Sequence, residues 1–180
     1  MSKRTLTALC LAVVLGAALP AAAQHAGEFS IGFNNSDAPI GLRYFLGERL
    51  AFDVGIGFDS TDLGPENATS WFFEFGLWHI LYDYGPTFFF VRPAIAYSVL
   101  DDRVFGEGFL DETWTVFDLE LNLGAEVRFA DRFGVTFQHG IRWSRTSLPD
   151  ELVDEGFDEN YSDFHSFGEN VTQAGVWFTF

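Results

Sequence analysis

A histidine close to a hydroxyl side chain could activate a nucleophile for acyl transfer, and His139 is the candidate for the base. The next hydroxyl residue after His139 is Ser144. An imidazole activates a hydroxyl only within hydrogen-bond reach. His139 lies in an extended, alternating segment, where Ser144 points to the opposite face. We therefore predict no catalytic residue.

Acidic residues gather before His165 and could collect Ca²⁺ or Mg²⁺, which prefer oxygen ligands. They are Asp154, Glu155, Asp158, Glu159 and Asp163. No Asp-x-Asp-x-Asp-Gly spacing of a calcium loop is present. A solvated acidic loop is therefore favoured over a metal site, and we predict neither a metal nor a cofactor.

Polar and apolar side chains alternate without exception along residues 117–129. The odd positions are Phe117, Leu119, Leu121, Leu123, Ala125, Val127 and Phe129, and the even ones are Asp118, Glu120, Asn122, Gly124, Glu126 and Arg128. A period of two predicts a β-strand, because a helix would spread the charges around its circumference. The segment is longer than the usual strand of about 5–6 residues. It exceeds the roughly 9–11 residues that cross a bilayer at a tilt.

The same alternation recurs and gives eight predicted strands, at about 28–33, 40–46, 50–58, 71–77, 89–99, 117–129, 135–143 and 173–180. Short turns at 47–48, 83–86 and 131–132 alternate with longer polar connections at 34–39, 60–69, 101–113 and 146–169. This is typical of bacterial transmembrane barrels with an even number of strands. We predict an all-β fold, an eight-stranded antiparallel up-and-down transmembrane β-barrel, with both chain ends at the short-turn, periplasmic end.

The two faces of the predicted strands differ too strongly for a soluble sandwich, and we expect the apolar face to point outward. The alternative is a soluble, lipocalin-like barrel with the apolar face inside, but the interior of eight strands is only just wide enough for side chains. With the polar face inside, charges must pair to offset their burial. The predicted lumen network is Arg43, Arg92, Arg128, Arg142, Glu28, Asp53, Glu74, Asp118, Glu120 and Glu126. Its six acids exceed its four arginines, and a wide pore is not expected.

The N-terminus has the three parts of a secretory signal peptide. Basic residues precede an apolar stretch at 6–19, and Ala21–Ala23 form a small-residue cleavage site. We predict a signal peptide at 1–23 and an outer-membrane β-barrel domain at 24–180. The whole chain has 180 residues and a net charge of −16. It has no basic run beyond its first residues and a single cysteine, Cys10. This excludes nucleic-acid binding and a disulfide scaffold.

The last residues, Ala174 to Phe180, end on phenylalanine with apolar side chains at every second position. Together with the strand, tight turn and strand of residues 123–135, they resemble the small OmpA-like outer-membrane β-barrel family. The resemblance implies that Val176, Phe178 and Phe180 form an assembly signal read by the barrel-assembly machinery. We expect a monomer in the bacterial outer membrane, surrounded by lipid, with a structural or surface-interaction role.

Two alternatives remain at this point. Lipid A deacylases are barrels of similar size that carry a His-x-Ser pair on the lipid-facing side of the penultimate strand, but Ile141 stands where the serine would follow His139. A narrow cation-selective channel is the other alternative, since the predicted lumen has an excess of acids. We expect a protein that is not an enzyme.

Overall fold

The computed structural model describes residues 26–62, 67–101, 113–130, 132–148, 160–166 and 172–180. The nine strands within these ranges are β1 (Phe29–Phe33), β2 (Ile40–Phe45), β3 (Leu50–Asp62), β4 (Asn67–Tyr84), β5 (Thr87–Asp101), β6 (Thr113–Ala130), β7 (Phe133–Ser147), β8 (Asn160–His165) and β9 (Thr172–Thr179). No helix in these ranges is long and apolar enough to cross a bilayer.

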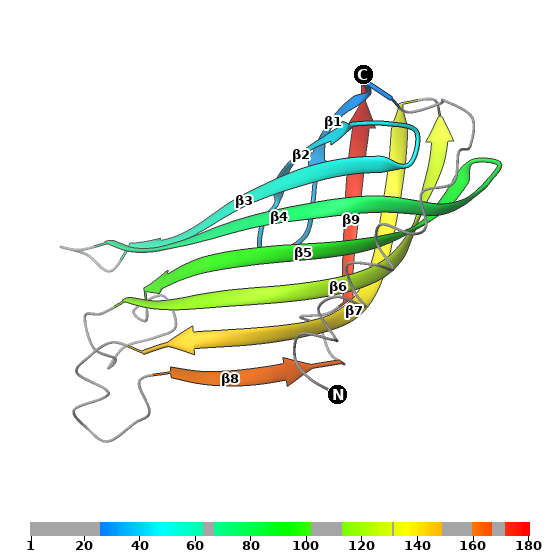
Figure 1. The fold of residues 1–180 in the computed structure, drawn as a ribbon. Coiled ribbons are helices and arrows are strands. Elements are labelled where there is room, and N and C mark those ends of the chain that lie inside the picture. The colour runs from blue at the N-terminus through cyan, green and yellow to red at the C-terminus, as the bar shows by residue number, and fades with distance from the viewer. Residues whose placement is uncertain (1–25, 63–66, 102–112, 131, 149–159, 167–171) are drawn as a thin grey trace, which may run out of the picture.

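The strands close into an antiparallel ring. Each of β1 to β7 pairs with the next along the chain, and β9 pairs with both β7 and β1. β8 pairs with the second part of β7, at Arg142–Ser147, and β9 pairs with the first part, at Phe133–His139. β8 and β9 therefore share the eighth position of the ring, and the predicted eight-stranded up-and-down barrel is confirmed (Figure 1).

Two predicted loops are partly strand. The connection predicted at 146–169 contains β8, and the one predicted at 60–69 is shortened because β3 runs to Asp62 and β4 begins at Asn67. These strand portions are rich in polar residues. An alternating apolar stripe is required only where a strand faces lipid or a core, so the period-two signal does not report these extensions.

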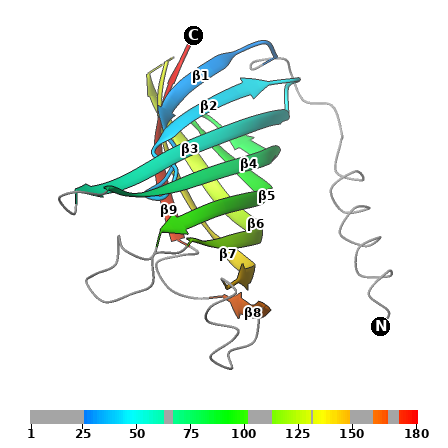
Figure 2. The same ribbon diagram turned by 90° about the vertical axis from the view of Figure 1, so that its left-hand side faces the viewer.

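The ring is complete only in the half that holds the short connections. β2 pairs with β3 no further than Ile40 opposite Ile56, while β3 continues to Asp62. Within the described ranges, residues 57–62 pair with β4 alone. Figures 1 and 2 show β3 to β7 extending well beyond β1, β2 and β9. We call this end the long-connection end and the other the short-connection end.

Both chain ends of the barrel meet at the short-connection end. The Phe180 amide donates to the Phe29 carbonyl over 2.8 Å, and the Gly27 amide donates to the Phe45 carbonyl over 2.9 Å. The turn between β4 and β5 lies at the same end, where Gly85 has a φ of 57°, a conformation that favours glycine.

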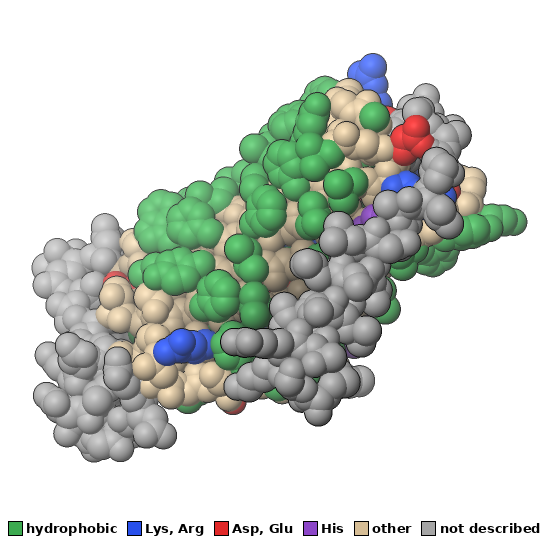
Figure 3. Space-filling model, viewed as in Figure 1, with side chains coloured by type: hydrophobic (Ala, Val, Ile, Leu, Met, Phe, Trp, Pro, Cys, Tyr) green, Lys and Arg blue, Asp and Glu red, His purple; other side chains and the backbone are tan. Residues whose placement is uncertain are grey.

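The apolar stripe faces outward, as predicted. Leu119, Leu121 and Leu123 are 45%, 38% and 61% exposed, whereas Glu120 between them is buried. Figure 3 shows hydrophobic side chains covering much of the visible wall. A soluble barrel with its apolar face inside is therefore excluded for the described strands.

The interior is not polar throughout. Near the short-connection end it holds an apolar cluster of Phe45, Ala51, Trp78, Ile80, Phe88 and Phe90. The Trp78 and Phe90 rings lie with their centroids 3.8 Å apart. The alternation predicts which face these residues occupy. It does not predict that aromatic side chains fill the lumen near the short-connection end.

Candidate functional site

The lumen is the candidate site, and Arg92 of β5 lies at its centre. Its Nη2 is 2.5 Å from Asp53 Oδ1 and 2.5 Å from Glu74 Oε1, and its Nε donates to Asp53 Oδ2 over 2.8 Å. The indole of Trp78 also donates to Asp53. Arg92 and Asp53 are fully buried. One guanidinium therefore pairs with two carboxylates from two other strands, β3 and β4.

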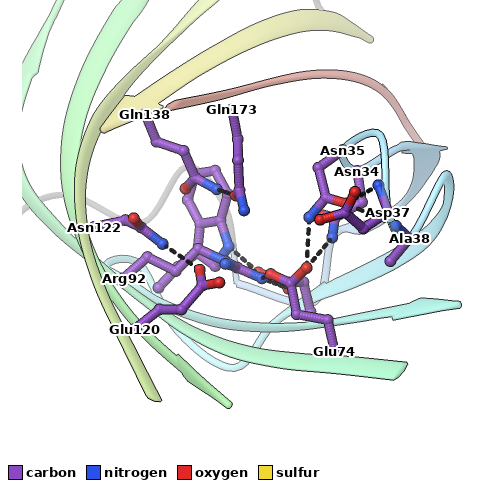
Figure 4. Close-up of polar contacts among 12 residues, drawn as sticks. Asn34, Asn35, Asp37, Ala38, Glu74, Arg92, Glu120, Asn122, Gln138 and Gln173 are labelled. Atoms are coloured by element: carbon purple, nitrogen blue, oxygen red, sulfur yellow. Dashed lines mark hydrogen bonds and ion pairs between the residues drawn. The ribbon is translucent and has the colours of Figure 1, made fainter. Parts of the chain in front are cut away.

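The connection between β1 and β2 folds into the lumen and contacts Glu74 (Figure 4). Asn35 Nδ2 and Asn34 Nδ2 donate to Glu74 Oε2 over 2.5 and 3.3 Å. Asn35 Oδ1 in turn accepts from the Ala38 amide over 2.7 Å, which fixes the turn. The sequence of residues 34–39 indicates only a polar connection, and nothing in it predicts that Asn34 and Asn35 lie in the lumen.

Gly57 of β3 has no side chain and so leaves space for this connection. A Cβ at this position would overlap the carbonyl oxygen of Asp37 and lie 2.9 Å from Pro39 Cδ. We expect Gly57→Ala to displace the connection and lower the free energy of unfolding in detergent by about 1–3 kcal/mol, the usual range for overpacking. Denaturant titration measures this. Gly47→Ala is the matched control, because nothing lies within 4 Å of its added Cβ. An equal loss in the two variants would contradict the assignment.

A second group of charges lies toward the short-connection end. The Arg43 guanidinium is sandwiched between the rings of Trp78 and Trp177, at 3.6 and 3.9 Å, and its Nη1 is 2.5 Å from Glu126 Oε2. A cation between two desolvated indoles is strongly held. Arg128 bridges Glu126 and Glu28 at 3.4 and 3.2 Å.

A third group lies toward the long-connection end. Arg142 Nη2 is 2.6 Å from Glu120 Oε1, and its Nη1 is 3.7 Å from Asp118 Oδ2. Asn122 Nδ2 donates to Glu120 Oε2 over 2.9 Å. A cavity of about 20 Å³ beside them has room for about one water molecule. Asp118 Oδ1 is buried and accepts no hydrogen bond from the described residues.

Each of the ten residues assigned to the lumen from sequence takes part in at least one ion pair. The pairs divide by charge along the barrel. Toward the short-connection end, two arginines face two carboxylates, Glu28 and Glu126. Around Arg92 and Arg142, two arginines face four carboxylates, Asp53, Glu74, Asp118 and Glu120. The excess of acid within this set is therefore confined to one half of the lumen.

His139 lies on the outward face, as predicted, and it has a hydroxyl partner on a neighbouring strand. Its Nδ1 is 2.8 Å from Thr172 Oγ1 on β9, directly opposite in the strand register. Ser144 points inward and does not reach it. Pairing across strands cannot be seen from spacing along one strand. His165 lies in β8 opposite Arg142.

The other predicted sites include an exposed row at the end of β9 and segments that lie outside the described residues. Val176, Phe178 and Phe180 point outward from the end of β9 and are 38%, 44% and 64% exposed. Within the described ranges, no group of three or more His, Cys, Asp or Glu side chains could hold a metal ion. The predicted signal peptide and loop residues Asp154, Glu155, Asp158 and Glu159 lie outside the described residues.

Comparison with known proteins supports the fold. No protein-family profile matches the chain, and no curated sequence matches it. Among solved structures, the N-terminal β-barrel domain of Pseudomonas aeruginosa OprF is similar, with a TM-score of 0.52 and 13% sequence identity. The match covers 87% of this chain and the whole of that domain. At this identity the likeness shows the fold alone: a closed barrel like that of the small OmpA-like proteins.

Proposed function

We propose that the chain is an integral outer-membrane β-barrel protein with a structural or surface-interaction role and no catalytic activity. The observation that carries the proposal is a strand ring that closes in the short-connection half and whose outward face is apolar around its circumference. Only a helix or a closed barrel satisfies its backbone groups in hydrocarbon. The outer membrane follows from the barrel architecture together with the predicted export signal.

We further propose that the ion pairs and the inward-folded connection close the lumen. Arg43 between two indoles and the apolar cluster beside it fill the short-connection half. Arg92, Glu74 and the two asparagines fill the middle. Planar-bilayer recordings are expected to show no current steps, and regular steps selective for cations would favour the narrow channel instead.

Insertion by the barrel-assembly machinery remains part of the proposal. Val176, Phe178 and Phe180 present one exposed apolar row at the end of β9, and the Phe178 and Phe180 rings lie 5.1 Å apart. An accessible row of this kind on a terminal strand is a surface that an assembly partner could contact.

A lipid-modifying hydrolase is the second candidate, supported by the hydrogen bond between His139 and Thr172. A base and a hydroxyl within this reach are two parts of an acyl-transfer site. The same hydrogen bond also pairs two polar groups on a lipid-facing wall. Polar groups at such a position need a partner even when they have no catalytic role. Expression of the chain is expected to leave lipid A acylation unchanged by mass spectrometry. A loss of one acyl chain that Thr172→Val abolishes would establish the hydrolase.

The experiment that tests the main proposal is membrane fractionation combined with gel migration of unboiled and boiled protein. A closed barrel resists unfolding in cold detergent, so we expect the protein in the outer-membrane fraction, with a mobility that changes on boiling. Protein in the soluble fraction, with the same mobility before and after boiling, would overturn the proposal.

A further inference from the structure

Arg145 is placed differently from the other arginines that the structure describes. Four of those line the lumen and two lie near the short-connection end: Arg43, Arg92, Arg128, Arg142, Arg49 and Arg132. Arg145 is exposed on the outward face of β7, near the long-connection end. Among the described residues it forms no ion pair, although the chain carries a net charge of −16. An exposed guanidinium without a carboxylate partner among the described residues can bind an anion.

The strand register places Arg145 at the border of the apolar wall. It lies opposite Phe117 of β6 and Ser162 of β8. Trp143 lies two residues closer to the middle of the wall and is opposite Phe164 of β8. The side chain of Phe164 is 65% exposed. Aromatic rings followed by a polar group are the usual composition of a membrane–water interface. Arg145 therefore stands where lipid headgroups would meet the barrel.

The Arg145 guanidinium lies beside polar side chains of β7 and β8. Arg145 Nη2 donates to Asn160 Oδ1 over 3.3 Å, and Ser147 Oγ donates to the same oxygen over 2.7 Å. Asn160 accepts both of these bonds through its oxygen, and its amide group carries two N–H donors that these bonds do not use. Arg145 keeps four of its five N–H donors, and the hydroxyl of Ser162 shares its face. None of the residues directly opposite or two positions away on this face is acidic.

We propose that Arg145, with Asn160 and Ser162, binds the phosphate of a membrane-lipid headgroup in the leaflet at the long-connection end. This inference rests on the proposed function, because it requires a bilayer around the wall. A guanidinium binds phosphate oxygens through two parallel N–H bonds, which a lysine cannot reproduce. Phe117, Trp143 and Phe164 would contact the glycerol and upper acyl region beneath it.

The test measures lipid binding to the protein in nonionic detergent by native mass spectrometry. The probes are phosphatidic acid, diacylglycerol with the same acyl chains, and inorganic phosphate. Arg145→Gln is compared with Arg132→Gln, which removes an exposed arginine at the other end. We expect Arg145→Gln to weaken phosphatidic acid binding about fivefold, the effect of one basic residue at a membrane surface. Arg132→Gln and the binding of diacylglycerol should be unchanged.

Three results would overturn the inference. Equal binding of phosphatidic acid by wild type and Arg145→Gln would remove the role of Arg145. Diacylglycerol binding as tightly as phosphatidic acid would remove the role of phosphate. Inorganic phosphate binding as tightly as the lipid would indicate a site for a free anion. Failure of the proposed function is recognised separately, since the wild-type protein would then show no heat-modifiable migration in the same detergent.

Discussion

Replacing Arg92 by methionine is expected to lower the free energy of unfolding in detergent by about 3–5 kcal/mol, the usual effect of removing one partner of a buried ion pair. The guanidinium contacts Asp53 and Glu74 at 2.5 Å each, and both it and Asp53 are fully buried. Without it, two carboxylates stay buried without a counter-charge. Denaturant titration of the folded barrel measures the loss.

Two further variants test whether charge is the cause. The triple change Arg92→Met, Asp53→Asn and Glu74→Gln removes the uncompensated charges and should recover most of the lost stability, because neutral groups of similar shape are tolerated where a lone charge is not. Arg128→Met removes a half-buried arginine near the short-connection end and should have a much smaller effect. If Arg92→Met were no more destabilising than Arg128→Met, Arg92 would not be the centre of the lumen network.

Leu121→Arg is expected to destabilise the protein in lipid bilayers by about 2–4 kcal/mol, the range for arginine at the bilayer midplane on a barrel wall. Leu121 points outward from the middle of β6 and is 38% exposed. The side chain has room, so the loss would come from moving a cation into hydrocarbon and not from a steric overlap. Reversible unfolding from vesicles measures it.

Leu46→Arg serves as the control for depth. Leu46 is 55% exposed and lies next to β2 at the short-connection end, where lipid-facing charge costs about 0–1 kcal/mol. A water-soluble barrel would tolerate an arginine at either exposed position. Equal and small effects of the two changes would therefore contradict a membrane around the wall, whatever the gel migration shows.

The face on which each side chain of a strand lies could be predicted from sequence, because alternating side chains leave only two possible orientations of the strand. Once Leu121 and its neighbours are assigned outward, Glu120 and Glu126 must point inward. The partners could not be predicted in this way. Arg43 meets Glu126 from a strand four positions away around the ring, and the two indoles that enclose it come from β4 and β9. Such contacts depend on ring closure and stagger, which no local pattern encodes.

The same limit applies to the contacts of residues 34–39 and of His139, which the sequence does not predict. Asn34 and Asn35 belong to a connection too short to carry any periodic signal, and their inward course depends on the space left by Gly57. Thr172 becomes the partner of His139 only through the pairing of β7 with β9. The hydrophobic alternation predicts the face of the strand on which a residue lies. The register between paired strands determines which side chains it contacts.

The pairing of β1 with β9 has a consequence for the order in which the strands of the barrel form during folding. Ser30 and Thr179, which share a hydrogen bond of 2.9 Å across this seam, are 149 residues apart in the chain. Every other pairing between described strands joins segments nearer in sequence, so hairpins form early and the seam last. Until then the backbone edges of β1 and of β9 that form this seam have no partner, and each is exposed to pairing with a strand of another copy of the chain. The slowest and most aggregation-prone step of folding is therefore the joining of the first strand to the final one.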